Sequence, residues 1–449
     1  MKKNNIIQII IIVILVIVLG ILVKLTIDQI NNKTSIEMNA EGKQQGGNMS
    51  MNDNSDSIER KGAKEFTDEQ DVTDQDYESS TSDESAVLIK DNGNITISES
   101  NINKKSGDST NVENSEFYGV NAGVLTTAGS TATIKNTNIT TSAKGSNAVF
   151  STGENSKIYI SDSKITTSSD SSRGLDATYG GYIEADNVTI STKGGSCATL
   201  ATDRGEGTVI AKNSNLSTAG SGSPVIYSTG NITLEDSKGT STGSQMVVVE
   251  GKNTATVTNS TLECSGKGNR NDVDNCGIML YQSMSGDAGE GTATFNATNS
   301  NLKISSDSNY YKNSPFFFIT NTKAVINLEN NNLEYGSDTL LKIEGTSEWG
   351  KTGSNGGEVT LNANNQQLVG NIEVDNISTA IINLKENSSF NGNINNENTA
   401  KSIELTMDKS STITLTGDTY ITKLNDEDSS YSNINFNGHT LCVNGEAIN

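Results

Sequence analysis

Residues 131–139 read Thr-Ala-Thr-Ile-Lys-Asn-Thr-Asn-Ile, and close variants of this phrase recur at 156–165, 207–216 and 254–262. In its first half, small or apolar side chains alternate with polar ones, as in a strand with one buried face. Its second half is rich in Asn, which tolerates the left-handed backbone of a tight turn. The equivalent apolar positions are Ile134, Ile158, Ile183, Val209, Ile232 and Val257. By subtraction they lie 24, 25, 26, 23 and 25 residues apart, within the roughly 20–50-residue periods of repeat proteins.

Each repeat holds three short strand-like runs. A second run follows the Asn-rich turn, as at 138–141, and a third follows a Gly/Ser turn, as at 147–150. A unit of this size cannot bury its own hydrophobic face, so successive units must stack on one another. The pattern predicts an all-β solenoid, a right-handed parallel β-helix. The chain has only 2 prolines, in keeping with strands that must all donate to a hydrogen-bond ladder.

The repeat divides the chain into segments. We expect the β-helix to cover residues 86–410 and a hairpin-like C-terminal cap to cover 411–449. After Leu262 the spacing lengthens, and the additional residues are polar. We therefore place insertions at 265–291, 306–314 and 346–357, as loops on the flank of the rod, where partners are most often bound.

The N-terminus carries a hydrophobic segment, Ile6 to Val23, interrupted only by Gln8 and Gly20. Its length suffices for a transmembrane helix, and no small-residue cleavage site follows it, so residues 1–27 are predicted to be an uncleaved signal anchor. A cleaved secretory signal is the alternative. Residues 28–85 are polar and acidic and are predicted to be a disordered linker. The expected location is the cell membrane, single-pass, with the bulk of the chain extracellular.

Charge and cysteine content narrow the range of partners. The net charge of −22 argues against nucleic acid as a partner and leaves membrane contact to the N-terminal helix. The four cysteines, at 197, 264, 276 and 442, form no disulfide scaffold, although Cys264 and Cys276 could join across the first insertion. No cysteine or histidine cluster suggests zinc, and the single histidine makes histidine-based acid–base catalysis improbable.

The best catalytic constellation consists of carboxylates with neighbouring arginines. Asp176 and Asp203 are 27 residues apart, about one repeat, so they could stack on one face of the rod beside Arg173 and Arg204. Paired carboxylates are the catalytic groups of glycoside hydrolases. A structural ladder of ion pairs between neighbouring coils is the simpler explanation of the same residues.

Two further sets of residues are candidates for binding. Asp272, Asp274, Asp287 and Glu290 in the first insertion could bind Ca²⁺, the one cofactor the sequence suggests. Tyr310, Tyr311 and Trp349 lie in or near insertions and could stack against sugar rings, although packing beneath a loop is the commoner fate of such side chains.

The phrases at 131–139 and Gly-Asn-Ile-Thr-Leu-Glu-Asp-Ser at 230–237 resemble the pectate-lyase-like β-helix repeats of bacterial adhesin-like surface proteins. The closing Ile-Asn-Phe-Asn-Gly-His-Thr-Leu-Cys-Val-Asn-Gly at 434–445 is similar to the terminal segment of such proteins in Gram-positive anaerobes. The resemblance covers residues 86–449. The polygalacturonase motifs Asn-Thr-Asp, Asp-Asp and Arg-Ile-Lys are not evident.

Anchor, spacer and repeat together predict a membrane-anchored, extracellular β-helical protein of adhesin-like or structural type, and they favour a non-enzymatic role. A glycan or another cell-surface protein is the expected ligand, so carbohydrate binding is one predicted role. The alternative is a polysaccharide lyase or glycoside hydrolase that acts on an extracellular glycan through the carboxylates named above.

Overall fold

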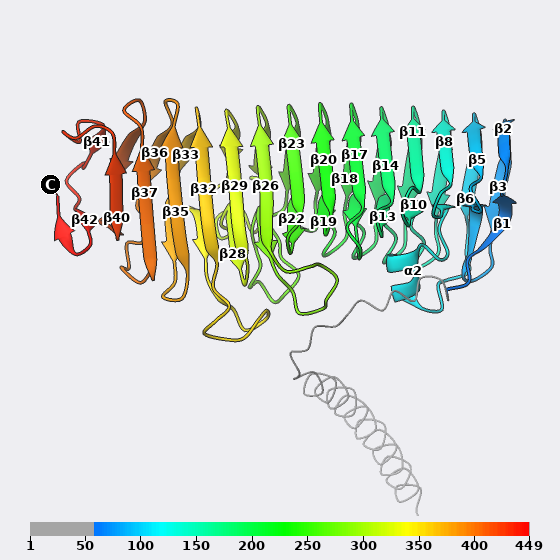
Figure 1. Ribbon diagram of the computed structural model, residues 1–449, viewed down its shortest axis with the longest axis horizontal. Helices are drawn as coiled ribbons and strands as arrows, with labels where there is room; N and C mark the ends of the chain where they lie inside the picture. The colour runs from blue at the N-terminus through cyan, green and yellow to red at the C-terminus, as the bar shows by residue number, and fades with distance from the viewer. Residues whose placement is uncertain (1–57, 449) are drawn as a thin grey trace, which may run out of the picture. The chain divides into compact units, whose positions relative to one another are not determined.

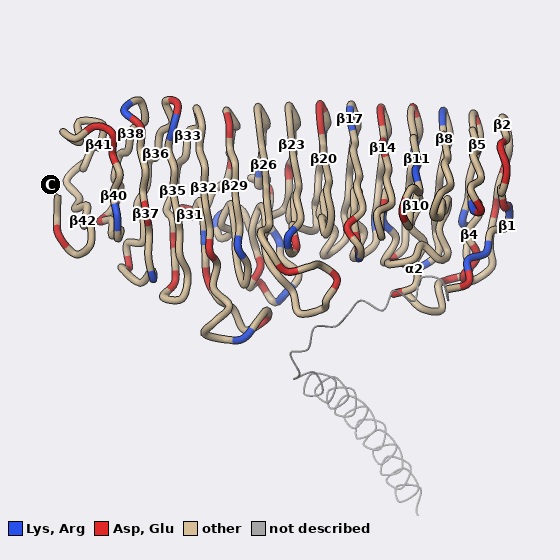
Figure 2. Tube along the Cα trace, viewed as in Figure 1, with Lys and Arg blue, Asp and Glu red and all other residues tan. Residues whose placement is uncertain are grey.

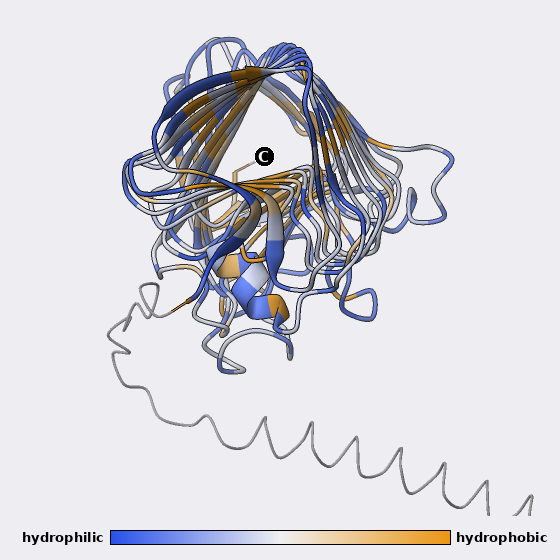
Figure 3. Ribbon diagram, turned by 90° about the vertical axis from the view of Figure 1, so that its right-hand side faces the viewer, coloured by the Kyte–Doolittle hydropathy of each residue, from blue (hydrophilic) through white to orange (hydrophobic). Residues whose placement is uncertain are grey.

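The computed structural model describes residues 58–448, which form a parallel β-helix (Figure 1). Each full coil contributes one strand to each of three sheets, here called sheets A, B and C. Every strand pair within these three sheets is parallel, and successive coils pair in register. Viewed along the axis, the sheets surround one apolar column (Figure 3). The predicted all-β parallel β-helix is therefore confirmed.

Sheet A has twelve strands: β1 (Lys61–Phe66), β4 (Glu84–Ile89), β7 (Val124–Thr126), β10 (Val149–Thr152), β13 (Leu175–Thr178), β16 (Leu200–Thr202), β19 (Ile226–Ser228), β22 (Val247–Glu250), β25 (Ile278–Tyr281), β28 (Phe317–Thr320), β31 (Thr339–Ile343) and β34 (Asn371–Val374). Sheet B has fourteen: β2 (Glu69–Thr73), β5 (Asn94–Ser98), β8 (Thr131–Lys135), β11 (Lys157–Ser161), β14 (Tyr182–Asp186), β17 (Thr208–Lys212), β20 (Asn231–Glu235), β23 (Thr254–Thr258), β26 (Thr292–Thr298), β29 (Lys323–Glu329), β32 (Glu358–Asn364), β35 (Thr379–Lys385), β37 (Ser402–Met407) and β40 (Lys423–Asp426).

Sheet C has ten strands: β3 (Asp76–Ser79), β6 (Asn101–Lys104), β9 (Asn138–Thr141), β12 (Lys164–Thr167), β15 (Thr189–Thr192), β18 (Asn215–Thr218), β21 (Lys238–Ser241), β24 (Thr261–Cys264), β27 (Asn301–Ile304) and β30 (Asn332–Glu334). Two short sheets belong to the C-terminal coils: β33 (Gln367–Val369), β36 (Ser389–Gly392), β38 (Thr412–Leu415) and β41 (Ile434–Asn435) form one, and β39 (Thr419–Ile421), β42 (Leu441–Val443) and β43 (Glu446–Ala447) form the other.

The strand register corrects part of the predicted alignment of repeats. Ile158 pairs with Ala132, not with Ile134, which pairs with Ile160. Likewise Val257 pairs with Leu234 and not with Ile232. The predicted alignment is wrong by two residues at both places, yet all of these side chains are buried. Side chains on a strand alternate with a period of two, so a shift of two residues leaves them on the same face.

The turn between sheets B and C explains why Asn recurs there. Its first residue has a left-handed backbone in coil after coil, with φ of 48° at Asn136, 55° at Asn187 and 52° at Asn213. Strand β18 begins two residues after Asn213, and the residue between them, Ser214, carries a buried hydroxyl. Thus Ser214 Oγ accepts a hydrogen bond from the Val188 backbone N–H at 3.2 Å. The sequence predicted the left-handed turn but not this ladder of side-chain hydrogen bonds between coils.

The described coils begin earlier than predicted. Strands β1, β2 and β3 lie within residues 28–85, so the prediction of a disordered linker is wrong for residues 61–85. Phe66 is buried and packs edge-on against Tyr77, and β2 pairs with β5 although its outer side chains are acidic. An acidic strand can belong to the coil because its acidic side chains are on the exposed face, whereas Gln70 and Val72 on the other face are partly buried. Acidic residues also occur in many other coils (Figure 2).

Two other predicted boundaries also change. The segment 265–291 is not one insertion but two, because β25 lies inside it. At the C-terminus, β38, β40 and β41 continue parallel sheets, and only β42 and β43 pair antiparallel. The predicted hairpin-like cap is thus reduced to one short hairpin. The hydrophobic segment Ile6 to Val23 and residues 28–57 lie outside the described residues. Among the described residues, no helix is both long enough and apolar enough to cross a membrane.

One short helix, α2 (Val112–Tyr118), lies in the connection between β6 and β7 and was not predicted. Its N-terminal N–H at Glu113 is capped by the Asn111 side chain, and it ends at Gly119, whose φ is 72°. Asn at the N-cap and Gly at the end are the usual boundary signals of a helix. Both signals are present in the sequence, but only seven residues lie between them, which is short for a helix.

The inter-coil ladder predicts the effect of Ser214→Ala. The substitution leaves the buried Val188 N–H without its acceptor, which costs about 1–3 kcal/mol. Chemical denaturation of the purified protein measures this cost as a loss in the free energy of unfolding. Ser142→Ala, which removes an exposed hydroxyl with no hydrogen bond among the described residues, is the matched control and should change it by less than about 0.5 kcal/mol. Equal losses for the two variants would contradict the ladder.

Candidate functional site

The outer face of sheet A carries the insertions. α2 and the loops on either side of β25 extend on the same side of the coil (Figure 1). Strand register brings Asp176, Ala201, Tyr227, Val248 and Met279 into one row across neighbouring strands. Tyr227, Val248 and Met279 of this row form the floor of a pocket of about 370 Å³, which is also lined by α2 and by the loops. A volume of this size is within the range of ligand-binding pockets.

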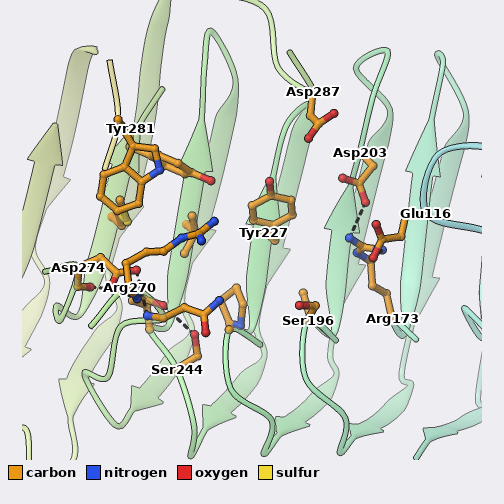
Figure 4. Close-up of a pocket in the computed structure, with 18 of the residues that line it drawn as sticks. Glu116, Arg173, Ser196, Asp203, Tyr227, Ser244, Arg270, Asp274, Tyr281 and Asp287 are labelled. Atoms are coloured by element: carbon orange, nitrogen blue, oxygen red, sulfur yellow. Dashed lines mark hydrogen bonds and ion pairs between the residues drawn. The ribbon is translucent and has the colours of Figure 1, made fainter. Parts of the chain in front are cut away.

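A cluster of charges centred on Arg173 occupies one end of the pocket. Its guanidinium lies 2.9 Å from Asp203, 3.6 Å from Glu116 and 3.7 Å from Asp176. Glu116 comes from α2, Asp176 lies in β13, and Asp203 directly follows β16, the neighbouring strand of sheet A. Figure 4 shows Glu116, Arg173 and Asp203 gathered together. Three carboxyl groups therefore surround a single cation in a buried position.

Burial sets the protonation of this cluster. It raises the pKa of Asp176 to about 7, because Asp176 is wholly inaccessible and the Arg173 charge only partly compensates. Burial likewise raises the pKa of Asp203 well above its usual range. Burial acts to lower the pKa of Arg173, but the charges of Asp203 and Glu116 outweigh it and raise that pKa. A buried carboxyl that keeps its proton near neutral pH can act as a hydrogen-bond donor.

Two tyrosines form the middle of the pocket. The hydroxyls of Tyr227 and Tyr281 donate hydrogen bonds of 2.8 and 2.7 Å to Glu250 Oε2. Burial, together with the Glu250 charge, raises the pKa of both tyrosines well above the usual value. Ser283 also donates to Glu250, which is 1% exposed. Glu250 thus fixes the positions of the two tyrosine rings that line the pocket.

The remaining walls come from loops. Trp349 packs edge-on against Tyr281, with ring centroids 5.3 Å apart. Asp287 pairs with Arg204 at 2.7 Å, and the Arg204 guanidinium lies 3.9 Å from the centre of the Phe117 ring on α2. Arg270 is an exposed residue of the loop before β25 and also lines the pocket. It lies on the opposite side of Tyr227 from Arg173 (Figure 4).

The predicted catalytic residues are only partly brought together. Asp176 and Asp203 both contact Arg173, as their spacing of about one coil suggested. Arg204 instead turns to Asp287, a contact that the sequence could not indicate because the two residues are 83 positions apart. The ion-pair ladder and a catalytic role both remain compatible with this arrangement.

The predicted calcium site is not assembled. Among residues 58–448, no group of three or more Asp, Glu, His or Cys side chains is arranged to hold a metal ion. Asp274 instead accepts hydrogen bonds from the backbone N–H groups of Asn269 and Arg270, at 3.0 and 2.8 Å. Asp287 is paired with Arg204, and β25 separates Asp272 and Asp274 from Asp287 and Glu290.

The predicted aromatic residues take different positions. Trp349 lines the sheet A pocket, although it is 6% exposed. Tyr310 lines a separate hollow of about 340 Å³, together with Asp272 and Lys342. Tyr311 packs against the main core, as loop aromatics often do. They therefore do not form one binding surface.

The cysteines are all free. Cys264 and Cys276 are both buried and form no disulfide, so that alternative is wrong. Cys197 does more than fill space, because its Sγ accepts a hydrogen bond from the Ser172 backbone N–H at 3.0 Å. In the next coil, Ser223 Oγ accepts from the Cys197 N–H in the same way. Cys197 thus takes the place of a serine in a second ladder between coils.

Sequence reasoning missed four residues that shape the pocket: Glu116, Tyr227, Tyr281 and Arg270. For Tyr227 and Tyr281 a signal existed, because each interrupts an apolar sheet A strand at an outward position. For Glu116 and Arg270 none existed, because each lies in an insertion whose path only the fold determines.

Comparisons with protein-family models, with curated proteins and with solved structures give no match.

The raised pKa of Asp176 predicts a pH dependence of stability. Its folded-state pKa of about 7 exceeds 3.8, so the folded protein holds this proton more tightly than the unfolded chain does. The stability that the protonated group contributes is therefore present at low pH and is lost as pH rises from about 4 to 7. In Asp176→Asn, the melting temperature should fall less between pH 4 and pH 7 than it does in the wild type. The exposed Asp186→Asn is the control, and a variant profile that parallels the wild type would contradict the shift.

Proposed function

We propose that this chain is an extracellular β-helical protein of the adhesin-like type, anchored through its N-terminal hydrophobic segment, which binds carbohydrate in the sheet A pocket. The anchor and the exterior location rest on the apolar run from Ile6 to Val23 and on the resemblance of the repeats. The binding role rests on the pocket, and a glycan is the chemical class that its lining suits best.

One observation carries the binding proposal. The pocket combines aromatic rings fixed in place with charged hydrogen-bonding groups: Tyr227 and Tyr281 are held by Glu250, between the Arg173 cluster and Arg270. Sugar hydroxyls can donate to carboxylates and accept from guanidinium groups, while the rings offer flat apolar surface. Because the tyrosines are pre-oriented, little side-chain entropy is lost on binding.

Binding should depend on Arg270 and Tyr281. Arg270→Ala removes an exposed cation that lines the pocket, so the fold should be unaffected. We expect about a tenfold loss of affinity, equivalent to about 1.4 kcal/mol, for the glycan that a glycan array identifies. Tyr281→Ala should weaken binding at least as much, because it also releases Glu250.

The matched control is Tyr159→Ala, which removes a tyrosine that is 38% exposed on the outer face of sheet B. Isothermal titration of residues 58–449 and of the three variants gives the affinities, and circular dichroism reports whether each variant folds. Unchanged affinity in Arg270→Ala and Tyr281→Ala, or no glycan bound by the wild type, would rule the proposal out.

The second candidate is a glycoside hydrolase or polysaccharide lyase, and the raised pKa of Asp203 favours it. A protonated carboxyl beside a pocket can donate its proton to a leaving glycosidic oxygen, while a carboxylate such as Glu116 acts as base. The same cluster also serves as a structural link between α2 and sheet A, which is why binding remains the leading proposal.

Turnover distinguishes the two candidates. Reducing-sugar and unsaturated-product assays on uronate and neutral glycans, with and without Ca²⁺, should show no product if the protein only binds. If it is an enzyme, Asp203→Asn should lower turnover by roughly 10²–10⁴-fold, the range of a lost general acid or base. Asp186→Asn is again the control. Product formation that survives Asp203→Asn would exclude this carboxyl as the acid.

A further inference from the structure

The N-terminal end of the pocket is closed by α2. The Phe117 carbonyl accepts a hydrogen bond of 2.9 Å from Thr178 Oγ1 at the end of β13. The Ser115 carbonyl accepts one of 2.9 Å from the Asn147 side chain. With the Glu116–Arg173 contact, these bonds fix the helix across the outer face of sheet A. A ligand lying along the axis therefore meets a wall at this end.

The C-terminal end is closed as well. Val248, Cys276, Met279, Phe318 and Trp349 form a separate apolar cluster outside the main core. Cys276 and Trp349 come from the loops before β25 and after β31, so these loops cover the strands that follow the pocket. The pocket extends from Arg173, just before β13, to Tyr281 in β25, which is four strand spacings of sheet A, or roughly 19 Å.

One flank is closed by the loop between β25 and β26, which runs back along the coil. Gly289 accepts a hydrogen bond of 2.9 Å from the Lys252 N–H, in the coil of β22. Asp287 then pairs with Arg204, which follows β16. The loop thus reaches back across three strands of sheet A and is tied to the coil at both points.

The loop between β24 and β25 closes most of the other flank. Its Asn269 accepts a hydrogen bond of 3.1 Å from Ser221 Oγ. A Cβ added to Gly222 would lie only 2.9 Å from the Asn269 amide nitrogen, so the loop rests directly on this corner. One coil earlier, Ser196 is exposed at the edge of the pocket, and among the contacts of the described residues no bond ties this loop to it.

Building on the proposed carbohydrate binding, we propose that the pocket takes the end of a glycan chain and not an internal stretch. Walls at both axial ends prevent a polymer from continuing along the rod. The Asp287 loop prevents it from leaving across the opposite flank. A chain that enters past Ser196 therefore has its terminal sugars between Tyr227, Tyr281 and the Arg173 cluster, with the rest of the polymer outside.

Competition between chain lengths tests this inference. The probes are a cellulose, a chitin and a polygalacturonate ladder, each from disaccharide to octasaccharide, with the matching soluble polymers. Whichever series binds the full-length protein, its oligosaccharides should compete at least about tenfold better than equal masses of polymer. Partial hydrolysis of the polymer should make it a stronger competitor, in proportion to the number of chain ends that hydrolysis creates.

Blocking the ends completes the test. Reductive amination of the reducing end, or 4-O-methylation of the non-reducing terminal residue, should abolish binding in one of the two cases. A polymer that competes as well as its oligosaccharides, mass for mass, would overturn end recognition while leaving carbohydrate binding intact. A wild type that binds no member of any series would instead defeat the underlying proposal.

A variant of the flanking loop gives an independent measure. Asp287→Ala removes the ion pair with Arg204 and should open this flank of the pocket. The polymer should then compete more strongly relative to the oligosaccharides than it does with the wild type. Glu404→Gln, which breaks an exposed ion pair of 2.8 Å with Lys423 on sheet B, is the control and should leave the ratio unchanged. An unchanged ratio in Asp287→Ala, with both variants folded, would show that the loop does not limit the ligand.

Discussion

The hydrogen bond between one coil and the next is the interaction on which this molecule depends. In sheets A, B and C, the strands within one coil do not pair with each other. Each strand pairs instead with the equivalent strand of the neighbouring coil, so a single coil cannot be stable by itself. The backbone ladder fixes the register, and the serine hydroxyls at the corners extend it to the turns. Outward-facing side chains at equivalent positions of successive coils therefore lie at a fixed spacing along the axis. This spacing determines which side chains can meet in a surface site.

The pocket shows how little additional structure such a scaffold needs. Two loops flanking a single strand, β25, supply both flanks, and a seven-residue helix supplies one end. Their contacts with distant coils, through Asn269 and Asp287, are polar and few. The rigid part of the site is sheet A with Tyr227 and Tyr281, whose shared partner Glu250 lies on the strand between them.

The Arg173 cluster illustrates a conflict between burial and charge. Three carboxyl groups share one guanidinium at a position that solvent scarcely reaches, and the pKa values of two of them rise as a result. A buried charge that loses its partner is costly, so the cluster both links α2 to the sheet and makes that link sensitive to protonation. The same property gives the cluster donors and acceptors of hydrogen bonds at neutral pH.

The sequence by itself determined the parallel β-helix, the three strands per coil and the left-handed Asn turns, because these depend on short-range patterns that repeat in every coil. It also placed Asp176 and Asp203 one coil apart. It misjudged the register by two residues at Ile134 and Val257, since alternation fixes the face of a strand but not its partner. Only the tertiary structure decided that Arg204 pairs with Asp287, that Glu116 reaches Arg173 and that Tyr281 shares Glu250 with Tyr227. These contacts join residues 23 to 83 positions apart through irregular loops and outer faces, where no local pattern records which partner a side chain will meet.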